Sequence, residues 1–81
     1  MDQLARSPKQ IGAVLRRRRR ALGLTQSDVA AQASLRQATV SSAETGDPMQ
    51  LDTLFNLLTV LELEIVLRPR SKGGPSVSDV F

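Results

Sequence analysis

Residues 24–46 read LTQSDVAAQASLRQATVSSAETG, and this stretch predicts two short helices joined by a tight turn. Thr25 is placed to cap the first helix, with Asp28 three residues later as the second member of a capping box. The turn falls at Ser34-Leu35. A second helix follows over residues 37–46 and ends at a glycine, because a helix C-terminus commonly needs a residue with positive φ.

The outward side of the second helix carries short polar side chains. Two helices of this length with small residues at their crossing form a helix-turn-helix. A face that is almost uncharged, rich in hydrogen-bonding groups and small can enter the major groove of DNA. The residues of this face are Arg36, Gln37, Ala38, Thr39, Ser41 and Ser42.

Composition indicates one small helical domain. A chain of 81 residues has a core of marginal size, which a partner subunit often supplements. Its apolar residues are mainly Leu, Ile, Val and Ala, and His and Cys are absent, which removes the commonest metal ligands. We therefore expect no catalytic residues, no metal and no cofactor. No apolar run is long enough to cross a bilayer, and no signal-peptide core is present, so a cytoplasmic location is expected.

Five consecutive arginines, Arg16 to Arg20, precede this motif. Such a block is either a solvated face or localisation signal, or a patch that attracts DNA phosphates. The apolar stripe of the first helix, from Ile11 to Leu22, crosses the block at Arg18 or Arg19. On a helical wheel Arg18 lies nearer the stripe centre. A buried guanidinium needs a carboxylate partner, for which Glu44 is suitably placed, unless both arginines extend to solvent.

The C-terminal part of the chain predicts a dimer. From Gln50 the sequence QLDTLFNLLTVLEL is apolar around much of a helix. A single chain of this size cannot easily bury so much apolar surface, so we expect a second subunit to cover part of it. Residues 63–69, LEIVLRP, then alternate as a β-strand. A lone strand would pair with its copy about a two-fold axis, although the helix continuing through Val66 is the alternative. The predicted dimerisation residues are Leu57, Leu61, Leu63, Ile65 and Leu67.

The sequence divides into four segments on this interpretation. Residues 1–6 form a frayed N-terminus, 7–62 a DNA-binding domain whose first helix starts at Ser7-Pro8, 63–69 the dimerisation strand and 70–81 a flexible tail. The tail ends in Val80-Phe81, either an exposed end or a hook for a partner protein.

The stretch over residues 24–46 resembles the phage-repressor type of helix-turn-helix, the XRE (Cro/C1-type) family. Residues 8–70 resemble HipB-like antitoxins of HipBA-type toxin–antitoxin modules, through TQSDVA, RQATVSSAE and LFNLLTVLELEIVLRP. The resemblance implies an all-α domain of four to five helices with one C-terminal β-strand that pairs across a dimer. Two positions depart from the family. Ser34 replaces the usual turn glycine, which implies either a strained backbone or a reshaped corner, and Arg36 replaces the usual Ser or Thr, which removes a cap and adds a cation.

The resemblance also implies a role for each residue of the motif. Gln26 would contact a phosphate at the N-terminus of its helix. Gln37 would read a base edge, and its amide suits adenine. Ala38 would touch a thymine methyl group, and Arg36 a guanine or a phosphate.

Three further side chains would complete the contact with DNA, and one ion pair would support it. Thr39 would bind a phosphate, and Ser41 and Ser42 would bind bases or phosphates through their hydroxyls. Each of these residues is otherwise a solvated helix residue. The family pairs Arg19 with Glu44, against the wheel argument for Arg18.

These features predict a repressor that binds palindromic, double-stranded operator DNA as a homodimer in the bacterial cytoplasm, associated with the nucleoid. A HipB-like antitoxin would also restrain a HipA-like kinase toxin. The alternatives are a stand-alone phage or plasmid regulator and a protein-binding adaptor that uses the Val80-Phe81 tip.

Overall fold

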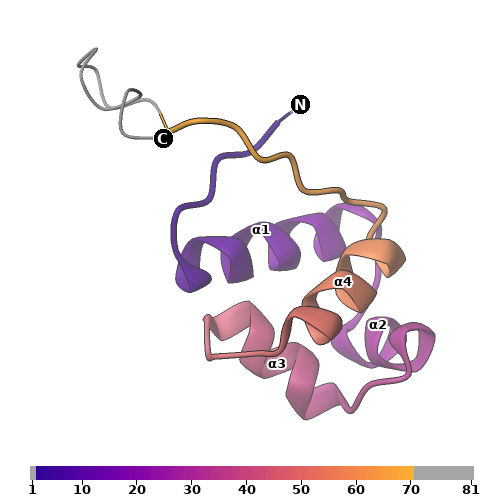
Figure 1. Ribbon diagram of the computed structural model, residues 1–81. Coiled ribbons are helices and arrows are strands. Elements are labelled where there is room, and N and C mark those ends of the chain that lie inside the picture. Colours follow the sequence, from indigo (N-terminus) through magenta and orange to yellow (C-terminus); the bar gives the residue numbers. More distant parts are fainter. Residues whose placement is uncertain (1, 71–81) are drawn as a thin grey trace.

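The computed structural model describes residues 2–70, which contain four α-helices (Figure 1). They are α1 (Pro8–Ala21), α2 (Gln26–Ala33), α3 (Gln37–Thr45) and α4 (Leu51–Val60). Helix α3 packs against α1 and α2, and α2 also packs against α4. The all-α helix-turn-helix domain is therefore confirmed, with α2 and α3 as the motif. None of these helices within residues 2–70 has the length and hydrophobicity needed to cross a membrane.

Short-range hydrogen bonds begin α1 and α2 where the sequence predicts. The Ser7 hydroxyl accepts the Gln10 backbone N–H at 3.1 Å, and Pro8 is the first helical residue. The Thr25 hydroxyl accepts the Asp28 N–H at 3.0 Å, while the Asp28 carboxylate accepts the Thr25 N–H at 2.9 Å. These bonds satisfy backbone donors that the first turn of a helix leaves unpaired. Both caps are confirmed.

Each of the four helices in residues 2–70 is followed by a residue in the left-handed backbone region. At the turn of the motif, the Leu35 N–H bonds the Ala30 carbonyl at 2.8 Å around Ser34. A residue other than glycine pays about 1–2 kcal/mol for this conformation, so Ser34 holds the strained backbone that the missing turn glycine predicts. The residues and their φ angles are Gly23 (73°), Ser34 (57°), Gly46 (95°) and Glu62 (57°).

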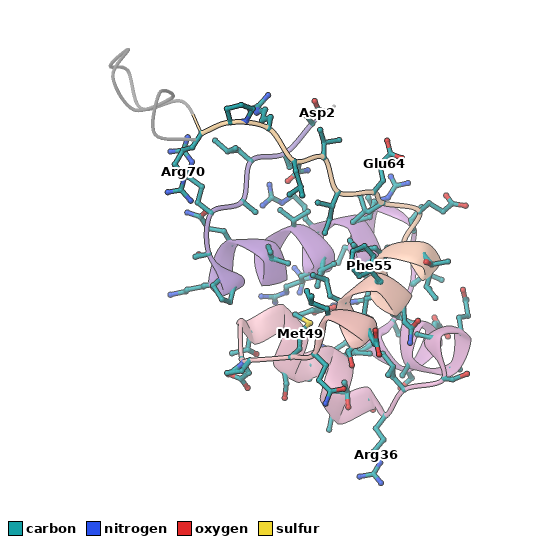
Figure 2. All side chains as sticks on the ribbon, viewed as in Figure 1. Asp2, Arg36, Met49, Phe55, Glu64 and Arg70 are labelled. Carbon is teal, nitrogen blue, oxygen red and sulfur yellow. The ribbon has the colours of Figure 1, made fainter. Side chains whose placement is uncertain are left out.

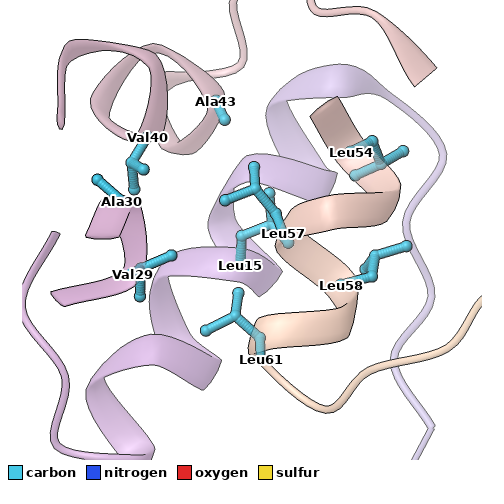
Figure 3. Packing of buried hydrophobic residues seen from close by; sticks show 9 residues of the cluster. All are labelled: Leu15, Val29, Ala30, Val40, Ala43, Leu54, Leu57, Leu58 and Leu61. Carbon is cyan, nitrogen blue, oxygen red and sulfur yellow. The ribbon is translucent and has the colours of Figure 1, made fainter. Parts of the chain in front are cut away.

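The core lies where all four helices meet (Figure 3). Its five largest fully buried side chains are at most 2% exposed and come from every helix or its end: Leu15, Val29, Val40, Leu57 and Leu61. Gly12 lets α1 approach α3 closely, because a Cβ there would lie 2.5 Å from the Ala43 carbonyl oxygen. This approach holds α3 against α1, the helix that carries the five consecutive arginines.

Two of the predicted dimerisation residues lie in this core instead. Leu57 and Leu61 are 1% and 2% exposed, so a second copy has no access to them. Helix α4 turns one face to the other helices, and both leucines are on that face. The apolar surface that α4 leaves open is Leu51 and Phe55, which are 69% and 53% exposed.

The predicted β-strand over residues 63–69 is not formed in the single chain, where residues 63–70 have no regular secondary structure. A strand needs a neighbouring strand, and residues 2–70 contain none that pairs with this segment. Leu63 packs against the core, whereas Ile65, Val66 and Leu67 are exposed. Most of the predicted tail and its Val80-Phe81 tip lie outside the described residues.

Candidate nucleic-acid interface

The outward face of α3 is built by the alternation of buried and exposed residues along the helix. Val40 and Ala43 point into the core, which turns the opposite side of α3 to solvent. Arg36 caps α3 without a side-chain hydrogen bond, and its guanidinium extends into solvent at the end of the molecule opposite Arg70 (Figure 2). Along this face Arg36, Gln37, Ala38, Ser41 and Ser42 are exposed and Thr39 is half-buried.

Gln37, the candidate base reader, is held by a neighbour on α2. The Ser27 hydroxyl donates to Gln37 Oε1 at 3.3 Å. Sequence reasoning missed Ser27, although its place beside Gln26 at the start of α2 was a usable signal. The contact joins the start of α2 to the start of α3.

Gln26, the candidate phosphate contact, is half-buried and already hydrogen-bonded. Its Nε2 donates to Glu44 Oε1 at 3.1 Å, which ties the start of α2 to the end of α3. An amide nitrogen has two hydrogens, so the second stays available for a phosphate oxygen.

The carboxylate of Glu44 pairs with Arg19 beneath this surface. Arg19 Nε donates to Glu44 Oε2 at 2.6 Å and Nη2 to Oε1 at 3.1 Å, a bidentate pair between two largely buried side chains. Its remaining nitrogen, Nη1, bonds the Leu24 carbonyl at 2.9 Å. The pair therefore joins α1, the loop before α2 and the end of α3.

Arg18 has a different partner from the one the wheel argument indicates. Its Nε donates to the Leu61 carbonyl at 2.9 Å, and its Nη2 lies 3.7 Å from the Glu62 carboxylate. A cation at this place satisfies a carbonyl that the end of α4 leaves free. Arg18 thus fixes the point where the chain leaves α4 toward residues 63–70.

Each member of the Arg19–Glu44 pair stabilises the ionised form of the other. Burial raises the pKa of Glu44, but hydrogen bonds from Arg19 and Gln26 outweigh burial and hold that pKa below its usual range. The hydrogen bonds that Arg19 donates to Glu44 raise the pKa of Arg19, against a smaller effect of burial. Both groups therefore stay ionised at neutral pH.

The other arginines of the block face a groove between α1 and α3. We call it the basic groove; it is lined mainly by Lys9, Arg16, Arg17, Arg20, Gln26, Ser41 and Glu44. Within residues 2–70, Arg16, Arg17 and Arg20 form no ion pair, unlike Arg18 and Arg19. The same described residues gather no group of three His, Cys, Asp or Glu side chains that could hold a metal.

The motif and its exposed face define a helix-turn-helix DNA-binding protein. A family model described as a helix-turn-helix domain matches residues 10–70. Antitoxin HipB of Escherichia coli O6:H1 is 32% identical over 74 residues, which are 90% of this chain and 79% of that protein. The chain belongs to the helix-turn-helix domain family and, within it, to the HipB-like antitoxins, which are not enzymes.

Solved structures give the same fold. A HipB-O4 20mer complex and a HipA-HipB-O2-O3 complex each contain a chain that superposes with a TM-score of 0.77 at 35% identity, over 83% of this chain and 96% of that chain. The restriction-modification controller protein C.AhdI from Aeromonas hydrophila gives a TM-score of 0.67 at 31% identity, over 70% of this chain and 88% of its own. Homologues of this chain thus bind operator DNA and HipA in complex structures.

Proposed function

We propose that the protein is a transcriptional repressor and antitoxin. It binds palindromic operator DNA as a homodimer through α3 and restrains a HipA-like kinase. The observation that supports this most is the relationship to HipB over 90% of the chain, together with the solvent-facing polar side of α3. Two copies of α3 would enter successive major grooves about one helical turn of DNA apart.

The proposed contacts follow from where each side chain stands. Gln37 reads one base edge, with adenine the best fit for its amide, and Ala38 touches a thymine methyl group. The guanidinium of Arg36 extends into solvent and binds a guanine or a phosphate. Gln26 binds a phosphate through its second amide hydrogen.

The hydroxyls of α3 complete the proposed half-site. Ser41 and Ser42 are exposed and bind bases or phosphates, and Thr39 is half-buried and binds a phosphate. Phosphate contacts supply most of the affinity, while the few base contacts supply the specificity.

The proposed dimer uses the apolar surface that the single chain leaves open. Leu51 and Phe55 on α4 are exposed, as are Ile65 and Leu67 on the segment that follows. Residues 63–69 pair with the same residues of the second copy, which satisfies their backbone groups about a two-fold axis. Pairing across the dimer also explains why one chain alone shows no strand.

The experiment that tests the proposal is purification of the tagged protein from its own host. The expected result is a co-eluting kinase and bound DNA from the protein's own upstream region. The recovered DNA is then used at several salt concentrations in a gel-shift assay, with random DNA of equal length as the control. Equal affinity for the two sequences would contradict a repressor.

A stand-alone regulator without a toxin is the second candidate. The likeness to the controller protein C.AhdI over 70% of this chain favours it. The same purification distinguishes the two candidate functions, because a stand-alone regulator would co-purify with DNA but not with a kinase.

A further inference from the structure

The five consecutive arginines divide into structural and free cations. Arg19 forms a largely buried ion pair with Glu44, and Arg18 donates to the Leu61 carbonyl and lies 3.7 Å from the exposed Glu62, so both have partners within the chain. Arg16 and Arg20 are exposed and make no ion pair within residues 2–70, and both line the basic groove. Lys9, one of the other exposed cations of α1, lines the same groove.

Three of the four free cations that line the groove form a row on one side of α1, and the fourth, Arg17, is turned about 100° away from Arg16 around the helix axis. At 100° per residue, Lys9, Arg16 and Arg20 lie within about 40° of one another around the helix axis. At 1.5 Å per residue the row is about 16 Å long. Phosphates of one DNA strand follow each other at about 3.4 Å along the duplex axis, so a row of this length passes several of them.

The carboxylate in the groove does not repel an approaching anion strongly, because its charge is already paired. This carboxylate, Glu44, has both oxygens occupied, by Arg19 at 2.6 Å and 3.1 Å and by the Gln26 amide at 3.1 Å. The net charge that faces the opening is therefore that of the free cations. Because an acidic partner meets no uncompensated carboxylate here, the groove attracts phosphate along its whole length.

The groove is continuous with the DNA-facing side of α3. Ser41 belongs to the proposed base-contacting face and also lines the groove, and so does Gln26, the proposed phosphate contact at the start of α2. A DNA strand that passes Gln26 at the edge of the major groove is therefore led toward α1.

We infer that Lys9, Arg16 and Arg20 bind the phosphate backbone of the operator beyond the bases that α3 reads. The inference rests on the proposed DNA-binding function and deepens it. It makes α1 a sequence-independent clamp that lengthens the DNA contact, separate from the base contacts of α3. The partner is duplex DNA rather than an acidic protein surface, because the row borders the helix that carries the base-reading residues.

The test measures how the affinity for operator DNA depends on salt. Arg16→Gln, Arg20→Gln and the double variant are compared with wild type by fluorescence anisotropy, on a duplex that extends past both half-sites and on random DNA of the same length. The slope of log K against log salt is negative, and each lost phosphate contact reduces its magnitude by about 0.9. A dimer carries each residue twice, so each single variant should reduce the magnitude of the slope by about 1.8. The ratio of operator affinity to random-DNA affinity should stay unchanged, since a backbone contact carries no sequence information.

The control is Arg70→Gln, which removes the same charge at the end of the molecule opposite Arg36 (Figure 2). It should leave the slope unchanged. All variants are checked by thermal melting, and exposed substitutions at Arg16 and Arg20 should melt within a few degrees of wild type.

Three other outcomes would overturn the inference. A slope that both groove variants leave at the wild-type value means that these cations touch no phosphate. An unchanged slope with a weakened kinase complex means that the groove binds the protein partner. A lower operator-to-random affinity ratio means that the residues read bases. Wild-type protein with no preference for its operator would instead contradict the proposed function itself.

Discussion

Replacing Glu44 by alanine should strongly destabilise the fold, because it leaves a largely buried guanidinium without its carboxylate. Two hydrogen bonds from Arg19 to the carboxylate are lost, at 2.6 Å and 3.1 Å. A hydrogen bond to a charged group contributes about 1.5–3 kcal/mol, and breaking a buried ion pair by removing one partner costs about 3–5 kcal/mol. The two estimates agree on a loss of at least about 3 kcal/mol.

A loss of this size is easily measured in a domain of this length. One kcal/mol shifts the melting temperature by about 4–8 °C, so Glu44→Ala should melt at least about 12 °C below wild type. The assay is thermal unfolding followed by circular dichroism at neutral pH and fixed protein concentration, because a dimer's stability depends on concentration.

Glu62→Ala provides the matched control. It is the same substitution at the acid that lies 3.7 Å from the neighbouring Arg18, but with a side chain 74% exposed. An exposed pair contributes about 0–1 kcal/mol, so this variant should melt within a few degrees of wild type. A Glu44→Ala protein that melts less than about 4 °C below wild type would refute the reasoning, and would mean that Arg19 reaches solvent once its partner is gone.

Four further predictions concern base reading, the turn, the helix contact and acid. Gln37→Ala should lose about 1–3 kcal/mol of operator binding at one base position, and an equal loss on random DNA would contradict base reading. Ser34→Gly should raise stability by up to about 1 kcal/mol, while the exposed mid-helix control Ala31→Gly should lower it by about 1 kcal/mol. Gly12→Ala should lower the free energy of unfolding by about 1–3 kcal/mol, because its Cβ would overlap the backbone of α3. A melting temperature equal to that of wild type would exclude that contact. The pKa of Glu44 is below its ordinary 4.5, so its contribution to stability is present above pH 4.5 and is lost as pH falls through the lowered value. Wild type should therefore lose stability below pH 4.5 more steeply than Glu44→Gln in melts over a pH series, and parallel curves would contradict this.

Local hydrogen bonding made the helices and their ends predictable. The serine and proline before α1 and the threonine–aspartate pair at α2 act on backbone groups within three residues. The strained turn at Ser34 was also predictable, because the position needs a left-handed residue whichever side chain it carries. The polar side of α3 followed from helical spacing alone.

Contacts between distant residues could not be predicted in the same way. Arg18 and Arg19 are neighbours in the sequence, yet one bonds the end of α4 and the other the end of α3. The helical wheel favoured Arg18 for Glu44, because a wheel gives directions around one helix and not the positions of the others. Only the family resemblance indicated Arg19.

Burial likewise depends on which helices meet. Leu57 and Leu61 are as apolar as Leu51 and Phe55, but the first two lie in the core and the last two in solvent. The hydrogen bond from Ser27 to Gln37 joins two helices across the turn, and spacing along one helix does not reveal it.

The amino-acid sequence by itself determined the starts of α1 and α2, the motif and the polar face of α3, because each depends on hydrogen bonds and spacing within a few residues. The tertiary structure alone decided the partner of Arg18, which leucines are buried and which cations stay free beside α3. These depend on the crossing of α1 and α3, where Gly12 brings the backbones together, and no local pattern encodes that distance. The strand predicted over residues 63–69 needs a partner strand that one chain lacks, so it depends on assembly beyond the single fold.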